Sequence, residues 1–203
     1  MLVFLRKKSP LPPFKKVSPF GKAGLAGIML TGLCLLSQVT FADFSISYAK
    51  TRLVDNVYLL DAKLNYRLTE VVIEALQHGV SLTLVLPIVV ERDRWYLWDE
   101  SIATLKQSYE LKYYALSKLY AIKYLNTSIQ ETFGSLNAAL TRLGNLEGFP
   151  LLDKHLIKPT KVYWVYLRVY LDIESLPVPL RPIAHLSSQW HLSSKWFVCS
   201  VQP

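Results

Sequence analysis

Residues 57–68 read VYLLDAKLNYRL, and this stretch decides the fold class. Aromatic or aliphatic side chains occupy every second position from Tyr58 to Leu68, and polar or charged side chains stand between them from Asp61 to Arg67. Successive side chains of a strand point to opposite faces, so this segment has one face to bury and one to expose. The pattern is typical of an antiparallel sheet that packs on one side only.

The same period of two recurs along most of residues 43–203. It predicts further strands that begin near Phe44 and run over 82–90, 103–113, 120–124 and 161–173. Two short helices interrupt these strands. Thr69 can cap a helix over 70–78 that ends at Gly79, and Ser135 can cap a second helix that stops at Gly144.

The remaining segments are expected to be irregular. Residues 145–160 are predicted to form a Pro-containing loop, and Pro177, Pro179 and Pro182 exclude a central strand around them. The sequence therefore predicts a single mainly β (α+β) domain over 43–203. Its architecture is expected to be an antiparallel β-sandwich or a strongly curved sheet with two short helices.

Residues 1–42 have the composition of an export signal. Residues 1–22 carry six basic residues and no acid, and residues 23–42 carry no charge. This is typical of a signal peptide cleaved after Ala42, or of an uncleaved N-terminal membrane anchor, since about 20 apolar residues can span a bilayer. Leu33 before Cys34 disfavours a lipoprotein. We expect the domain to be periplasmic, or anchored in the inner membrane and exposed to the periplasm.

Charge and cysteine content argue against a nucleic-acid-binding protein and against a disulfide-stabilised domain. Residues 1–42 hold six of the 23 basic residues and none of the 15 acidic ones, so residues 43–203 carry a net charge of only +2. A nucleic-acid partner is therefore not expected. Cys199 is the one cysteine after residue 42, which excludes an intramolecular disulfide and favours a small core side chain.

Two groups of aromatic residues are the candidate binding sites. Trp95, Tyr96 and Trp98 stand among charged residues that can pair across a hairpin; the rings can contact a partner or fold back over the sheet. Trp164, Tyr166 and Tyr170 occupy the outer face of the last long strand, where a second layer covers them or they line a binding groove. No catalytic motif, metal-ligand cluster or cofactor-binding loop is recognisable, so no catalytic residue, metal or cofactor is predicted.

The order of several segments resembles the DUF4390 family of exported proteobacterial proteins. These segments are VYLLDA (57–62), EALQHGV (74–80), WYLWDE (95–100), LKYYALS (111–117) and LDIESLPVPLR (171–181), followed by Trp190 and Trp196. The resemblance covers about residues 44–198. It implies an envelope location and a domain without an assigned activity, and neighbouring sensor-kinase genes in the family imply a link to envelope signalling.

We therefore expect a non-enzymatic binding or accessory module of the cell envelope. Its partner would be an envelope protein or an apolar ligand, with membrane contact through residues 1–42 if they are not cleaved. A lipid or apolar-ligand carrier, with a cavity inside a curved sheet, is the alternative. An envelope hydrolase is the weakest alternative, because no histidine and acid are placed to act together in the sequence.

Overall fold

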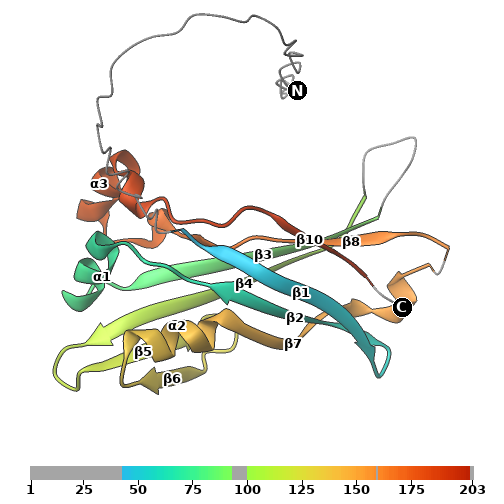
Figure 1. Cartoon of the computed structure of the whole chain (residues 1–203), viewed down its shortest axis with the longest axis horizontal. Coiled ribbons are helices and arrows are strands. Elements are labelled where there is room, and N and C mark those ends of the chain that lie inside the picture. Colours follow the sequence, from blue (N-terminus) through green and yellow to red (C-terminus); the bar gives the residue numbers. More distant parts are fainter. Residues whose placement is uncertain (1–42, 93–99, 159, 202–203) are drawn as a thin grey trace, which may run out of the picture. The chain divides into compact units, whose positions relative to one another are not determined.

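The stretch that decides the fold forms β2 (Val57–Asn65), the middle strand of a three-stranded antiparallel sheet. The computed structural model describes residues 43–92, 100–158 and 160–201, all within the compact unit Thr40–Pro203 (Figure 1). β1 (Ser45–Val54) and β7 (Asn145–Asp153) flank β2. Tyr58, Leu60, Ala62 and Leu64 are buried, which confirms the predicted alternation.

A seven-stranded antiparallel sheet lies against the first one. Its strand order is β10 (Phe197–Ser200), β8 (Tyr163–Leu167), β3 (Leu82–Arg92), β4 (Glu100–Tyr114), β5 (Leu119–Tyr124) and β6 (Gln130–Phe133). The short strand β9 (Tyr170–Leu171) also pairs with β3. The mainly β, antiparallel class predicted from the sequence is confirmed.

The core fills the space between the two sheets. Leu60 from β2 and Leu84, Leu86, Ile88 and Leu167 from the longer sheet are fully buried. In the described part of the chain, every core residue lies between Phe44 and Leu192. These residues form one core cluster within the compact unit Thr40–Pro203, so residues 43–203 are expected to fold on their own.

The predicted helices are present, with one addition. α1 (Glu70–Gln77) is capped by Thr69, whose hydroxyl accepts from the Val72 amide, and Gly79 follows it with φ of 88°. α2 (Leu136–Gly144) is capped by Ser135. The prolines after residue 176 do not form strand but lead into an unpredicted third helix, α3 (Arg181–Leu186). The described part of the chain also contains short 3₁₀ turns: η1 (Lys154–Leu156), η2 (Ile173–Ser175), η3 (Val178–Leu180) and η4 (Ser188–Trp190).

Gly144 is the last residue of α2, as the sequence predicts. It does not adopt a positive φ; instead, it lies so close to β2 that a Cβ atom would overlap the carbonyl oxygen of Leu64. This close approach lets Ala139 and Leu143 of α2 enter the core. α2 thereby covers the border between the two sheets on the side of β2 and β5 (Figure 1).

Two local predictions are wrong. Much of the expected loop at 145–160 is strand β7, an edge strand, where Pro150 removes no hydrogen bond from the sheet interior. The expected strand over 161–173 is divided into β8 and β9. Pro87 of β3 has no amide to donate at this point, and the Val169 amide donates instead to Ser194 Oγ at 3.0 Å.

Helices α1 and α3 and the turn η4 lie together at one end of the sandwich, and the start of β1 lies at the same end (Figure 1). Thr69 Oγ1 donates to the carbonyl of Gln189 at 2.9 Å, which joins α1 to η4. Trp190 is buried beneath them. Among the described residues, no helix combines the length and the apolar character that crossing a bilayer requires.

Candidate functional site

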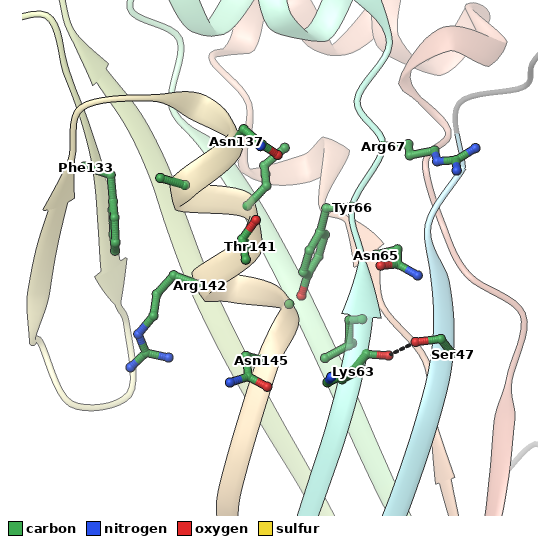
Figure 2. A pocket seen from close by; sticks show the side chains of 14 residues that line it. Ser47, Lys63, Asn65, Tyr66, Arg67, Phe133, Asn137, Thr141, Arg142 and Asn145 are labelled. Atoms are coloured by element: carbon green, nitrogen blue, oxygen red, sulfur yellow. Dashed lines mark hydrogen bonds between the residues drawn. The ribbon is translucent and has the colours of Figure 1, made fainter.

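A groove of about 940 Å³ separates α2 from the end of β2 (Figure 2). β2 and the residues after it form one wall, and the exposed side of α2 forms the other. The lining residues are Ser47, Lys63, Leu64, Asn65, Tyr66, Arg67, Phe133, Asn137, Ala138, Leu140, Thr141, Arg142, Gly144 and Asn145. Polar and apolar side chains therefore alternate within one open site.

The local structure of each wall determines which of its side chains line the groove. Asn137 and Thr141 stand four residues apart on α2, so they share the helix face that looks into the groove (Figure 2). On the other wall, Tyr66 continues the buried face of β2 while Asn65 and Arg67 continue its exposed face. The groove thus offers side-chain amides on both walls.

Tyr66 is the most unusual group in the groove. Its ring is 7% exposed and packs edge to face on Phe44, with ring centroids 5.1 Å apart. Its hydroxyl points toward the C-terminal end of α2 (Figure 2) and has no hydrogen-bond partner among the described residues. Burial and the nearby Tyr109 phenol raise the pKa of Tyr66 well above its usual range. The hydroxyl is therefore a neutral, buried donor and acceptor.

The charged residues that line the groove are all basic. Lys63, Arg67 and Arg142 line it, and none of its described lining residues is acidic. Arg142 is already engaged, because its Nε and one Nη donate to the Glu131 carboxylate at 3.0 and 3.1 Å. Lys63 and Arg67 are exposed, and neither forms an ion pair within the described residues. Their charges remain available to a ligand.

The predicted aromatic face lies elsewhere, on the outer side of β8 and β9. Trp164 is 36% exposed, whereas Tyr166 and Tyr170 are half-buried. The Arg168 guanidinium lies over the rings of Tyr170 and Trp196, at 5.4 and 5.9 Å from their centroids. Trp196, which was not predicted as a site residue, is thus part of this face, and the face is only partly covered.

The predicted loop site with Trp95, Tyr96 and Trp98 lies outside the described residues. The residues flanking 93–99 are described, and Arg92 forms an ion pair with Glu100 between β3 and β4, one of the pairings that the sequence allows. The residues 1–42 also lie outside the described part. In the residues that the structure describes, no group of His, Cys, Asp and Glu is placed to hold a metal ion.

The groove was missed in the sequence because its signal is weak. Tyr66 reads as one more core residue of an alternating strand, and Asn137 and Thr141 read as the solvated side of a short helix. Only the packing of α2 against β2, through Gly144, brings them together. The lone cations Lys63 and Arg67 on the exposed face of residues 57–68 were the one available hint.

The fold and the groove define a mainly β domain with an open surface groove. The chain belongs to the DUF4390 family: the model of this domain of unknown function matches residues 42–200. The resemblance seen in the sequence is thereby confirmed. No curated protein sequence and no solved structure matches the chain.

Proposed function

We propose that the protein is an exported, non-enzymatic binding module of the cell envelope, and that its groove between α2 and β2 binds an extended acidic segment of a partner protein. The observation that carries this proposal is the buried, unpartnered Tyr66 hydroxyl in a groove with cations and no acid along its described lining. A buried hydroxyl without a partner costs about 1–3 kcal/mol, so its retention favours a functional role.

The chemistry of the groove suits a polypeptide. The side-chain amides of Asn65 and Asn137 can donate to and accept from backbone groups of an extended segment. Lys63 and Arg67 attract carboxylates, which speeds encounter and disfavours basic partners. Leu140 and Phe133 add apolar contact area. Buried side chains of both sheets form one core cluster between them, which favours a surface groove instead of the enclosed cavity that a lipid carrier would need.

The test is binding of a fluorescein-labelled oligoglutamate of about ten residues to purified residues 43–203. Fluorescence anisotropy is expected to show saturable binding that weakens at least about tenfold in Lys63→Glu/Arg67→Glu. Lys106→Glu removes an exposed cation from the outer face of the longer sheet and is expected to change affinity less than about twofold. If the peptide does not bind, or if both variants lose the same affinity, the groove is not the site that binds an acidic segment.

Tyr66→Phe separates function from stability. Removing a buried hydroxyl that has no partner is expected to leave the free protein as stable, or about 1 kcal/mol more stable. The same substitution should weaken peptide binding, because the groove loses a buried hydrogen-bonding group. If Tyr66→Phe lowers stability and leaves binding unchanged, the hydroxyl has a structural role and no role in peptide binding.

The aromatic face is the second candidate surface for the same function. Trp164, Tyr166 and Tyr170 stay predicted binding residues. The observation in their favour is the exposure of Trp164 on β8 and of Trp196, which directly precedes the neighbouring strand β10. Trp164→Ala/Trp196→Ala in intact cells should reduce chemical cross-linking to a partner if this face binds it. Unchanged cross-linking would show that the partner does not bind this face, and the groove would remain the candidate binding site.

The proposed location rests on the sequence of residues 1–42. An alkaline phosphatase fused behind Pro203 is expected to be active, because this enzyme folds only outside the cytosol. The activity should disappear when residues 1–42 are deleted. An inactive fusion of the full chain would place the domain in the cytosol and remove the envelope from the proposal.

A further inference from the structure

The end of the sandwich that carries α3 exposes large aliphatic side chains. Val178 is 70% exposed, Ile183 60% and Leu186 90%. They belong to residues 177–186, PVPLRPIAHL, which contain no acidic residue. Ile183 and Leu186 stand three positions apart on α3 and so share a face. Clustered exposure of this kind marks a surface that contacts something apolar.

The structure holds this segment with its aliphatic side chains outward. Leu176 and Ala184 are fully buried and anchor it to the core. The Nε of Arg181 donates to the Leu176 carbonyl at 2.8 Å, and the Nε2 of His185 lies 2.8 Å from the Glu174 carboxylate. The polar side chains of the segment are therefore engaged by the domain, whereas Val178, Ile183 and Leu186 remain available.

The start of the domain lies at the same end. The Ser193 amide donates to Asp43 Oδ1 at 3.3 Å, shortly after η4, and β1 begins beside α1 and α3 (Figure 1). Asp43 directly follows residues 23–42, which carry no charge. Such a stretch has the length and composition to enter a bilayer. The chain therefore joins the domain at the end that exposes the aliphatic side chains.

We propose that this end of the domain rests on the surface of a lipid bilayer, with Val178, Ile183 and Leu186 in the interfacial region. Glu70 and Glu74 on α1 lie at this end as well, together with Arg67 and Lys195. Because charges of both signs are present, attraction to anionic lipid is not the driving force. The contact is shallow and apolar, and it should persist in high salt.

The test uses residues 43–203 with a histidine tag ahead of Asp43, tethered to nickel-chelating vesicles of phosphatidylethanolamine and phosphatidylglycerol. In a Cys199→Ser background, the dye NBD is attached to Leu186→Cys or, as a matched control, to Leu156→Cys. Leu156 is also an exposed leucine (57%) in a short helical turn, at the opposite end of the domain. Emission from position 186 should rise at least about twofold and shift to the blue, in about 0.5 M NaCl as well.

Substitution of the neighbours separates insertion from mere tethering. Val178→Asp/Ile183→Asp changes two exposed positions and should preserve the circular dichroism spectrum, yet lower the signal at position 186 to that at position 156. Equal signals at the two positions in the parent protein, or no effect of the aspartates, would overturn the proposal. So would a dimer in sedimentation velocity that requires Leu186 and forms without vesicles, because a second copy would then cover the face.

Discussion

The hydroxyl of Thr51 on β1 donates a hydrogen bond to the carbonyl of Ser200 on β10, across 3.2 Å. Thr51 is 3% exposed, so this contact is shielded from water. β1 belongs to the three-stranded sheet and β10 to the seven-stranded one. The bond therefore ties the two sheets together along one side of the sandwich, and α2 covers their border on the side of β2 and β5.

Thr51→Val is expected to lower the free energy of unfolding by about 1 kcal/mol, because valine keeps the shape but leaves the Ser200 carbonyl without this donor. Thr51→Ser retains a hydroxyl and serves as the control, with a smaller loss. Urea denaturation of residues 43–203 measures both. Equal losses in the two variants would assign the effect to packing of the threonine methyl group instead of the hydrogen bond.

Gly144→Ala is expected to destabilise the domain by at least about 2 kcal/mol. Its Cβ would overlap the Leu64 carbonyl, so α2 must move away from β2. Gly134→Ala is the matched control, since nothing lies within 4 Å of a Cβ at that position, and its effect should stay within about 0.5 kcal/mol. Similar stabilities for the two variants would show that α2 does not pack as closely as described.

Asp61 links stability to pH. Burial opposes its ionisation, but the Gly148 amide at 2.8 Å and the Arg52 guanidinium at 2.7 Å outweigh burial and lower its pKa. A lowered folded-state pKa adds stability above the unfolded value near 4, and this stability is lost as pH falls through the folded value. Asp61→Asn should lower the free energy of unfolding by about 1 kcal/mol at pH 7. The expected loss is this small because Arg52 is half exposed and solvent screens its charge.

The difference in the free energy of unfolding between wild type and Asp61→Asn should shrink as the pH falls below about 4, because the wild-type carboxylate becomes protonated. Urea denaturation at a series of pH values measures it. A difference that stays constant from neutral to acidic pH would mean that the carboxylate charge contributes nothing.

Cys199 is expected to be unreactive in the folded domain. Burial raises the pKa of its thiol to about 11, so little thiolate exists at pH 8. The rate of reaction of residues 43–203 with Ellman's reagent at pH 8 should be roughly 10–100-fold lower in buffer than in denaturant. Equal rates would contradict the prediction that Cys199 serves as a core side chain.

The elements with strong local signals could be predicted from the sequence. Thr69 and Gly79 bracket α1 because a cap and a left-handed glycine act locally, whatever lies around them. Leu82 to Val90 was predicted as strand because its inward side chains are all aliphatic. Such signals depend on neighbours in the chain and need no knowledge of the tertiary structure.

The misses have the opposite character. β7 contains Gly148 and Pro150 and lacks alternation. It is held in place by pairing with β2, and even its nearest partners in the sequence, Lys63 and Asn145, are 82 residues apart. The break after β8 is caused by Pro87 on another strand. The groove at Tyr66 exists only because Gly144 admits α2 so closely. None of these relationships is visible within a window of neighbouring residues.

Site-specific photo-cross-linking in intact cells shows whether the groove captures an envelope component. Benzoylphenylalanine replaces Thr141, on the groove side of α2, or Lys106, on the outer face of the longer sheet, in the full chain. If the groove binds the partner, an adduct forms at position 141, Lys63→Glu/Arg67→Glu abolishes it, and none forms at position 106. Adducts of equal yield at both positions, or none at position 141, would contradict binding in the groove.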